Sequence, residues 1–501
     1  FMLTHQSLWF DEGWSLSYSD ASSLLESISK VRELGGEAGD SNRFCPLYPI
    51  VLFCWREVFG DTEFALRSLS VFLWIFSVIA LFFNVLRIYG KKQAIWSSLI
   101  LALSSFCVYH SQEVRNYSLL IFLTSLQLFF FTEALYTEES KKTKYFKFGF
   151  WLFTAIGLFG NILMVIFSTS LAISYLITYR NLKQWLTWWI PAVLFCVPVF
   201  IYYFTLPDAT NPTSIPVSRQ GFPIIQNALF VIYGLLVGTS YGPPMEQLRG
   251  QDRVQVVLNY WPHLLILSIV ISIILVALFR VLFISRDSLK YKKLNRFFSL
   301  LLVLLFFLSL FFAIATKINF VPRHAFYACL PLAIILPSAF IDRQNSKSTK
   351  TSRFSQLGKF AVILLLILNV YSNFQYYFNQ NYARDDYRAA AQYIQENKGD
   401  SVQSILLWGH LRLLRYYGDT LTLDGTKSEL ENIKGKNLAQ QVNSLSQNAK
   451  TVFLVLNREF YWGRKRDAEE EMSSLYALKS QVGFPYFNIY RFTKMANRGD
   501  S

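Results

Sequence analysis

Charged residues are scarce in this sequence: Asp, Glu, Lys and Arg make up 16% of its 501 residues, whereas hydrophobic residues make up 53%. Soluble globular proteins average about 25% charged residues, so this composition excludes an ordinary soluble fold. Cysteines are also scarce, and they lie in or beside apolar runs without paired spacing. This excludes a disulfide framework and a cysteine-based zinc site, and the cysteines are expected to pack as small hydrophobic residues. The five cysteines are Cys45, Cys54, Cys107, Cys196 and Cys329.

Three familiar sequence features are missing. No Gly-rich phosphate fingerprint occurs, so no nucleotide site is expected. No internal repeat is evident either. No signal peptide opens the chain, which begins with Phe1 and not with an initiator Met. We therefore expect a further stretch before Phe1, containing one more membrane span that leads outward.

Apolar runs are what the chain has in abundance. Runs long enough to cross roughly 30 Å of hydrocarbon recur along its first three quarters. They predict a polytopic α-helical membrane protein with about ten spans, or about eleven with the missing one. A break near Gly160 and Asn161 separates two short runs. The predicted spans are residues 64–87, 93–110, 114–136, 148–162, 163–179, 185–206, 260–284, 297–316, 324–341 and 355–376.

Basic residues outnumber acidic ones, giving a net charge of +15. In a soluble chain this excess would suggest binding to nucleic acid, but here it follows the predicted loops. If residue 1 lies outside, twenty Lys and Arg residues fall on the inner side of the spans and six in the outer loops between spans. This positive-inside bias fixes the orientation. The basic residues are therefore assigned to the cytoplasmic leaflet, and no nucleic-acid partner is expected.

The composition becomes polar after residue 378. We predict a transmembrane domain at residues 1–378 and a small α/β domain at residues 379–501, which ten spans would place outside. Within the second domain, strand-like runs occur at residues 402–408, 451–456 and 487–492, and helix-like runs at residues 385–396 and 468–481. Two apolar segments are too short to cross. Leu47–Trp55 is expected to lie in the interface, and Ile224–Val237 is expected to form a re-entrant or surface helix that covers a site.

An acidic pair, Asp11 and Glu12, precedes the first predicted span and lies between Trp9 and Trp14. Aromatic residues of this kind suit the headgroup level of a bilayer. Carboxylates at that level can bind a metal ion or take a proton from an attacking hydroxyl. The alternative is structural, because acidic residues at a helix start act as caps. Taken alone, the pair fits a cap better.

The outer turn from His110 to Tyr117 carries a second polar group. It places Glu113 and Arg115 at the same outer surface, where a lipid phosphate would lie. Arginine binds phosphate through two parallel hydrogen bonds. A cap is again the alternative, with Ser111 starting the following helix.

Two further arginines are candidates for binding an anionic headgroup. Arg67 lies just inside an outer span end, where an ionisable group needs a partner such as Glu63 or a lipid head. Arg323 opens a later span beside His324, and it either snorkels to the interface or binds phosphate. His324 is expected to be a hydrogen-bonding neighbour and not a base.

In this order the segments resemble the GT-C superfamily of membrane glycosyltransferases, above all the bacterial branch related to protein O-mannosyltransferases and the lipid A aminoarabinose transferase. The likeness is strong over residues 1–137, looser in the later spans and limited to architecture in the last domain. The family's His-Pro-Pro-Leu appears here as residues 44–47, Phe-Cys-Pro-Leu, so the family's His is missing. The matching segments are residues 8–12, LWFDE; 46–48, PLY; 59–67, FGDTEFALR; and 109–117, YHSQEVRNY.

The resemblance implies a hexosyl- or pentosyltransferase that moves a sugar, with inversion, from a polyprenyl-phosphate-linked donor to a lipid, glycan or protein acceptor. It implies an extracytoplasmic site at the bacterial inner membrane and a role in cell-envelope biosynthesis, such as that of lipopolysaccharide. The catalytic carboxylate falls on Asp11, with Glu12 and Glu113 joining the site. Oxygen ligands would favour Mg²⁺ or Mn²⁺, held by Asp11 and Glu113, if a metal takes part. The other expected site residues are Arg115, Arg323 and Arg67 for the donor phosphate, and Trp9, Gln112, Tyr117 and His324 for the substrate.

Three other classes of protein fit parts of the pattern. A lipid-sugar flippase or transporter would also be polytopic and basic inside, but it should show repeated halves and charges at the membrane midplane. An O-antigen-ligase-like enzyme would share the substrates without the first-loop acidic pair. A membrane receptor would explain the outer domain but not the carboxylates and arginines.

Overall fold

The computed structural model describes most of the chain. The described residues are 2–34, 44–206, 225–250, 253–279, 282–283, 289–316, 318–341, 349–397, 403–418, 438–446, 449–458 and 468–495. The Gly-, Asp- and Ser-rich residues 35–43 and the Pro-rich residues 207–224 lie outside these ranges.

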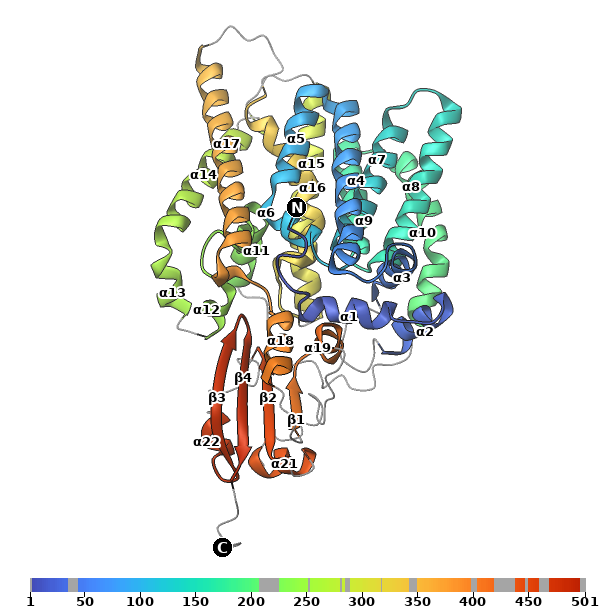
Figure 1. The fold of residues 1–501 in the computed structure, drawn as a ribbon. Helices are drawn as coiled ribbons and strands as arrows, with labels where there is room; N and C mark the ends of the chain where they lie inside the picture. Colours follow the sequence, from blue (N-terminus) through green and yellow to red (C-terminus); the bar gives the residue numbers. More distant parts are fainter. Residues whose placement is uncertain are drawn as a thin grey trace, which may run out of the picture. The chain divides into compact units, whose positions relative to one another are not determined.

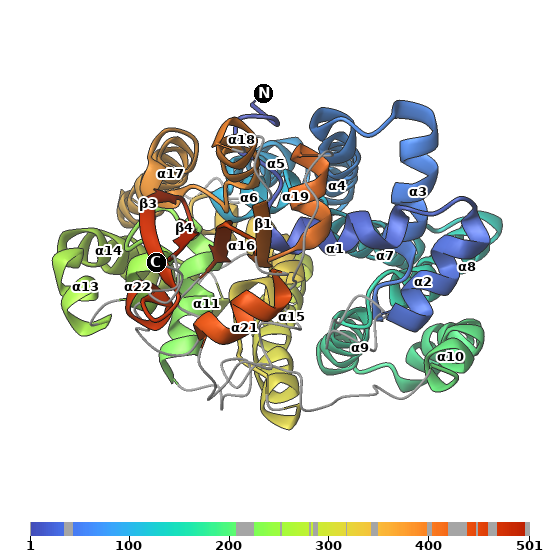
Figure 2. The same ribbon diagram turned by 60° about the horizontal axis from the view of Figure 1, so that its bottom comes forward.

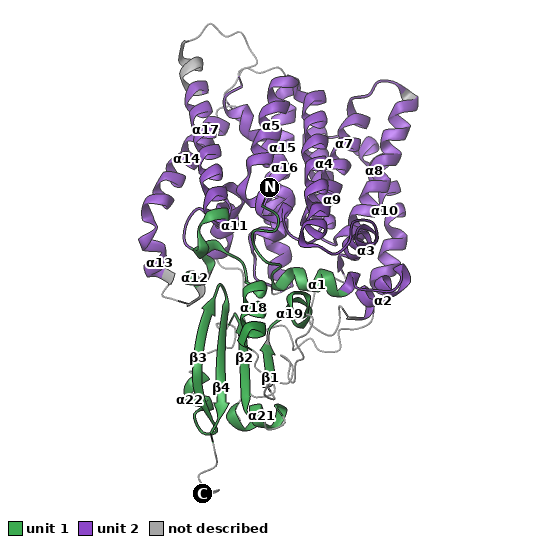
Figure 3. Cartoon of the chain, in the orientation of Figure 1, with its two compact units in different colours: residues 1–17, 244–253, 377–501 green, residues 18–243, 254–376 purple. Residues whose placement is uncertain are grey.

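The chain divides into two compact units (Figure 3). Unit 1 contains residues 1–17, 244–253 and 377–501, and unit 2 contains residues 18–243 and 254–376. The predicted soluble domain, residues 379–501, therefore belongs to a unit that also includes two segments from earlier in the sequence. The predicted domain division after residue 378 stays a prediction.

Unit 2 is a bundle of helices, seen from two directions in Figures 1 and 2. Helical segments occur at all ten predicted spans, and α8 ends at Gly160, where the break was predicted. The helices are α2 (Leu24–Leu34), α3 (Leu47–Phe59), α4 (Glu63–Tyr89), α5 (Lys91–Leu103), α6 (Ser105–Ser111), α7 (Tyr117–Tyr136), α8 (Ser140–Gly160), α9 (Met164–Tyr179), α10 (Leu182–Phe204), α11 (Ile225–Val237), α13 (Arg253–Asn259), α14 (Trp261–Phe279), α15 (Leu289–Ala315), α16 (Cys329–Ile335) and α17 (Thr349–Phe378), with the 3-10 helices η5 (Pro322–Ala328) and η6 (Leu336–Ala339).

Six helices among the described residues are long and apolar enough to cross a membrane, and α5 with α6 makes a seventh if this bent pair counts as one span. The six are α4, α7, α10, α14, α15 and α17. The protein is thus a polytopic helical membrane protein, while the number of ten spans stays a prediction. The most apolar window of α7 is 67% buried, against 17% for that of α10. Helix α7 is therefore central in the bundle, and α10 is peripheral.

The span predicted at residues 93–110 is broken at Ser104, where α5 and α6 meet at 61°. A break releases backbone groups that lipid cannot satisfy, and two asparagines of α17 bind them. Asn369 accepts a hydrogen bond from Ser105 N at 2.8 Å, and Asn373 donates one to Leu103 O at 3.2 Å. Asn369 also donates to Leu236 O, near the end of α11. Helix α17 therefore fixes the direction in which α6 leaves the break.

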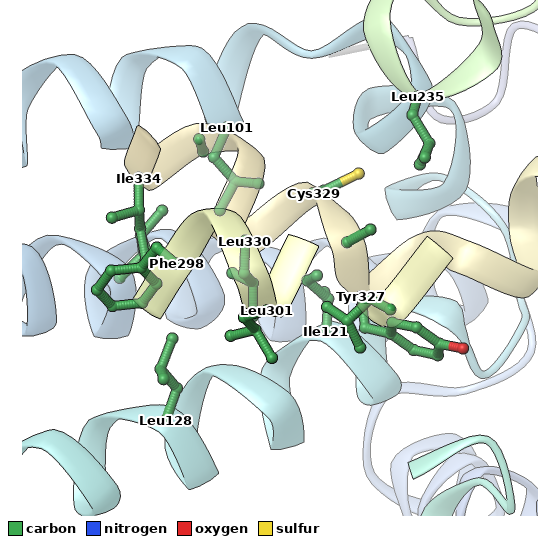
Figure 4. Packing of buried hydrophobic residues seen from close by; sticks show 14 of the residues in the cluster. Leu101, Ile121, Leu128, Leu235, Phe298, Leu301, Tyr327, Cys329, Leu330 and Ile334 are labelled. Atoms are coloured by element: carbon green, nitrogen blue, oxygen red, sulfur yellow. The ribbon is translucent and has the colours of Figure 1, made fainter. Parts of the chain in front are cut away.

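The interior of unit 2 is an apolar cluster with α16 at its centre. Leu330 and Ile334 of α16 are fully buried and lie beside Phe298 and Leu301 of α15 (Figure 4). Lipid tails are as apolar as these side chains, so the hydrophobic effect does not hold membrane helices together. Close packing of this kind, with hydrogen bonds between helices, stabilises the bundle instead. No disulfide joins the five cysteines, as predicted, and four of them are buried.

Unit 1 contains a four-stranded sheet with the order β1-β2-β4-β3 (Figure 1). Strand β1 (Gln403–Trp408) pairs in parallel with β2 (Thr451–Asn457), and β4 (Phe487–Lys494) runs antiparallel to both β2 and β3 (Tyr476–Phe484). All of β2 is buried, as expected for a central strand. The helices of this unit are α1 (Phe10–Ser19, which continues into unit 2), α12 (Met245–Gly250), α18 (Tyr387–Asn397), α19 (Leu411–Tyr417), α21 (Leu438–Leu445) and α22 (Ala468–Met472), with the 3-10 helix η7 (Gln380–Tyr382).

The three predicted strands and the helix predicted at residues 385–396 are confirmed. The helix predicted at residues 468–481 is wrong beyond Met472, because β3 begins at Tyr476. Three consecutive glutamates at the start of that run favoured a helix. A tight turn decides otherwise: Tyr486 adopts a positive φ of 61° and returns the chain into β4. Gly and Pro just before this turn were the sequence signal for a hairpin.

Candidate functional site

The predicted acidic pair lies in the first turn of α1. The Glu12 carboxylate turns back and accepts a hydrogen bond from Trp9 N at 3.0 Å. This bond is one half of a capping box, so the structural alternative applies to Glu12. Glu12 is fully buried, whereas Asp11 keeps 9% of its surface exposed. Asp11 is therefore the less buried of the two acids.

The segment before α1 is held by Asp385, which lies just before α18. One carboxylate oxygen of Asp385 accepts a hydrogen bond from Phe10 N at 3.1 Å, and its backbone carbonyl accepts one from Ser7 Oγ at 2.7 Å. The other carboxylate oxygen is 3.0 Å from Arg458 Nε. Asp385 is fully buried, so this ion pair is screened little by water.

Arginines and aromatic rings surround the same segment. The guanidinium carbons of Arg458 and Arg384 lie 5.1 Å and 5.7 Å from the centre of the Trp9 ring, within the range of cation–π attraction. Arg384 also lies 4.0 Å from the Glu12 carboxylate. The Nε1 of Trp9 is buried and has no hydrogen-bond partner in the described part of the chain. Trp9, Asp11 and Glu12 are thus gathered at the start of α1 by side chains from the C-terminal part of unit 1.

The turn between α6 and α7 holds the second predicted group. Glu113 is fully buried, and its Oε2 is 2.6 Å from His110 Nδ1. Its backbone carbonyl accepts a hydrogen bond from Ser70 Oγ of α4 at 2.6 Å. The predicted alternative, in which Ser111 starts a helix, is wrong, because Ser111 ends α6. Glu113 therefore has no capping role, and its carboxylate is paired with an imidazole.

Aromatic rings fix the orientation of His110. The ring centres of Phe106, Tyr117 and Phe326 lie 4.7, 4.6 and 5.3 Å from that of His110. Phe326 belongs to η5, which also carries Arg323. Because Phe326 packs on His110, the start of η5 lies near the α6–α7 turn.

The predicted cationic positions differ in exposure. Arg67 and Arg115 are buried, whereas Arg323 and His324 are half-buried. Arg67 precedes Ser70 by one helical turn and shares its face of α4. Gln112, also half-buried, caps the end of α6. The Nδ1 of His324 is shielded from solvent and has no hydrogen-bond partner among the described residues. It is available to a ligand that donates a hydrogen bond.

Unit 2 thus brings the α6–α7 turn, α4 and η5 together, and unit 1 brings Trp9, Asp11 and Glu12 together. That both groups act on one substrate stays a prediction.

Within the described ranges, no group of three or more His, Cys, Asp or Glu side chains could hold a metal ion. Mg²⁺ is often bound through only one or two carboxylates, with water and substrate phosphate completing its shell. Asp11 and Glu113 therefore remain candidate ligands, although the Glu113 carboxylate is already bonded to His110.

Sequence reasoning missed the residues that hold the candidate groups in place. Asp385 appears at the start of a helix-like run, where an acidic residue predicts an ordinary cap. Ser70 is a small residue in an apolar span, and Arg458 lies after a strand without any motif. The only available signal was the charged cluster that begins with Arg384, close behind the last predicted span.

Comparison with known proteins identifies the architecture. A family model described as dolichyl-phosphate-mannose-protein mannosyltransferase matches residues 45–204. No curated protein matches the sequence. The structure is similar to that of ArnT from Cupriavidus metallidurans in the apo state, with a TM-score of 0.57 and 11% identity over 97% of this chain and 94% of that one. ArnT bound to undecaprenyl phosphate gives a TM-score of 0.58 and 11% identity over 98% and 95%.

The chain shares the fold of ArnT. This similarity and the family model agree with the resemblance found in the sequence, and the shared fold covers nearly the whole chain. At 11% identity the similarity establishes the architecture, so the chemistry has to be argued from the residues of the two groups.

Proposed function

We propose that this protein is a glycosyltransferase that moves a sugar from a polyprenyl-phosphate-linked donor to a lipid, glycan or protein acceptor. In this proposal the reaction takes place at the extracytoplasmic face of the bacterial inner membrane, during synthesis of a cell-envelope glycoconjugate such as lipopolysaccharide. The observation that carries the proposal is the GT-C fold over nearly the whole chain, combined with carboxylates at both positions where the family resemblance expects them. ArnT has been solved with undecaprenyl phosphate, and the matching family model is named for a dolichyl-phosphate sugar.

The chemistry follows from the leaving group. A lipid phosphate departs as a stable anion, so a dedicated general acid is less necessary than in glycoside hydrolysis. Two tasks remain, namely taking the proton from the acceptor hydroxyl and stabilising the negative charge on the phosphate. Attack on the side opposite the phosphate inverts the configuration at the anomeric carbon.

Asp11 is the proposed base, because it is the less buried member of the acidic pair and lies at a helix N-terminus. Glu12 supports it through the capping bond to Trp9. The N-terminal end of a helix favours negative charge, which suits the role of a base.

Glu113 is the proposed acceptor or metal ligand, oriented by its bond to His110. The proposed phosphate ligands are Arg115, Arg67 and Arg323. His324, with its unpartnered Nδ1, is a proposed substrate contact, together with Trp9, Gln112 and Tyr117. If a metal takes part, it is Mg²⁺ or Mn²⁺, and it would polarise the acceptor oxygen.

Purified protein incubated with a radiolabelled polyprenyl-phosphate sugar and a bacterial lipid extract tests the proposal. We expect label in an acceptor, and we expect Asp11→Asn to lower the rate by about 10²- to 10⁴-fold, the usual contribution of a general base. Asp20→Asn, just beyond the other end of α1, is the matched control. Full activity of Asp11→Asn would remove the assignment, and movement of the donor across vesicles without transfer would favour a flippase. EDTA followed by Mg²⁺ shows whether a metal takes part.

A further inference from the structure

The start of α1 is held by the C-terminal part of unit 1. The first N–H groups of any helix lack partners within the helix. Here Phe10 N donates to Asp385 at 3.1 Å, and Leu8 N, just before the helix, donates to the Tyr417 hydroxyl at 2.7 Å. Both acceptors come from more than three hundred residues later in the chain. The position of this helix start is therefore set by distant side chains as well as by its own sequence.

Asp385 is held in turn by Arg458. Their charges meet at 3.0 Å, with Asp385 fully buried. Arg458 adopts a positive φ of 54°, which is uncommon for a residue with a side chain, and its backbone N–H donates to Tyr486 O at 2.7 Å. The turn that closes the β3–β4 hairpin thus directs the Arg458 guanidinium towards Asp385 and the Trp9 ring.

The fit between α1 and the loop after β1 is also close. A Cβ added to Gly13 would lie 2.6 Å from Nδ1 of His410. The His410 ring meets the rings of Phe10 and Trp14 edge-on, with centres 5.6 Å and 4.9 Å away. Only glycine at position 13 allows the imidazole to lie against the helix next to Asp11.

We propose that the C-terminal α/β domain positions the proposed base, with Asp385, Arg458 and Tyr417 as positioning residues. They act through the backbone of residues 8–10 and so set where the Asp11 carboxylate lies relative to the acceptor. The catalytic part of this inference rests on the proposed function, whereas the structural part does not. A domain that only bound an acceptor would not need the buried Asp385, paired with Arg458, to bond to the start of α1.

Hydrogen–deuterium exchange of the full chain in nanodiscs tests the structural part. Arg458→Met keeps the length of the side chain and removes its charge, which leaves Asp385 buried without this cation. We expect amide exchange in residues 8–17 to rise about tenfold or more, the effect of losing a charged hydrogen bond, while β2 exchanges as before. Arg491→Met is the matched control, because Arg491 lies on the same sheet and also covers a ring, that of Phe453. Unchanged exchange in residues 8–17 overturns the proposal.

Tyr417→Phe provides a milder variant in case Arg458→Met unfolds the domain. It removes only the hydroxyl that accepts from Leu8 N, and it should raise exchange at the start of α1 by a few-fold. A rise spread equally over the sheet in both variants means a general structural role and also overturns the proposal.

Kinetics test the catalytic part. We expect Arg458→Met to lower kcat at least tenfold with the KM for the lipid donor within twofold of wild type, because the base moves while the donor site stays intact. Arg458→Lys should restore part of the rate. A raised KM with unchanged kcat would instead show that the domain binds substrate. If the wild-type protein transfers no sugar but exchange responds as expected, the proposed function fails and the positioning of α1 stands. If Asp11→Asn is fully active, only the assignment of Asp11 as the base fails.

Discussion

The contact between His110 and Glu113 orients a carboxylate that is buried. A fully buried acid is costly unless a partner compensates it, and the His110 imidazole at 2.6 Å provides that compensation. The surrounding aromatic rings prevent the imidazole from turning away. Sequence reasoning selected Glu113 through its neighbours in the chain, but it assigned no role to His110, because His110 lies on a helix end and the bond depends on the turn after it.

His110→Phe should keep the aromatic packing and remove the bond to Glu113. We expect kcat to fall about tenfold, since a buried charged group that loses its hydrogen bond costs roughly 1.5–3 kcal/mol. The transfer assay with labelled donor measures this. Tyr109→Phe, which alters the neighbouring ring by one hydroxyl, should stay within twofold of wild type. Equal activity of His110→Phe and wild type would show that Glu113 does not need the imidazole.

Tyr387 is a second residue at which burial determines behaviour. Burial raises the pKa of its phenol well above the usual value, and the nearby Asp385 adds to this rise. The hydroxyl therefore stays protonated, donating to Asn457 Oδ1 at 3.2 Å and accepting from His410 N at 2.9 Å. Below pH 10 the Tyr387 phenol is protonated in both the folded and the unfolded state, so its contribution to the free energy of unfolding is fully present. Above it only the unfolded state ionises, and stability falls.

Tyr387→Phe should therefore lower the free energy of unfolding by about 1–3 kcal/mol near neutral pH, because His410 N loses its acceptor in a buried place. Thermal unfolding of the full chain measures this, and the loss should shrink above pH 10. Tyr393→Phe, whose hydroxyl faces Ser480 in a half-buried position, should cost less. A pH-independent difference between Tyr387→Phe and wild type would contradict the assigned pKa shift.

At the scale of elements, the long helices and most strands follow from periodicity, because apolar runs and alternating runs carry their own signal. The positions of breaks and turns do not follow from periodicity. The bend at Ser104 depends on Asn369 and Asn373, which lie in a helix far along the chain. Strand β3 depends on its pairing with β4, and this pairing outweighs the helical preference of the glutamates before it.

Asn369→Leu removes the acceptor of Ser105 N and the donor to Leu236 O while keeping the side chain of similar size. We expect a loss of about 1–3 kcal/mol, since hydrogen bonds between membrane helices contribute about 0.6–1.7 kcal/mol each. Thermal unfolding in detergent measures the loss. Gln375→Leu on the same helix is the control, because its bond to Tyr371 stays within α17. An equal effect of both variants would show that the bend needs no support from α17.

At the scale of the whole molecule, the distribution of Lys and Arg predicts that the α/β domain lies outside. Alkaline phosphatase fused after Ser501 should be active in a bacterial host, and green fluorescent protein at the same place should be dark. A second fusion in the predicted inner loop between α8 and α7, after Thr137, should give the reverse pattern. The opposite result at Ser501 would invert the topology and move the proposed reaction to the cytoplasmic face.

The two candidate groups were predicted from short motifs, whereas the residues that hold them were not. A motif such as the acidic pair is local and visible in the sequence. Asp385, by contrast, is separated from its partner Ser7 by 378 positions, and no pattern within either segment predicts such a contact. Contacts between residues so far apart in the sequence form only in the complete fold.

The same separation gives synthesis a fixed order. Helix α1 leaves the ribosome early, whereas Asp385, Tyr417 and Arg458 follow only after the last span. Until these residues have been synthesised, the start of α1 lacks its distant hydrogen-bond acceptors. In the proposed enzyme, Asp11 is therefore held in place only after this part of the chain has been made.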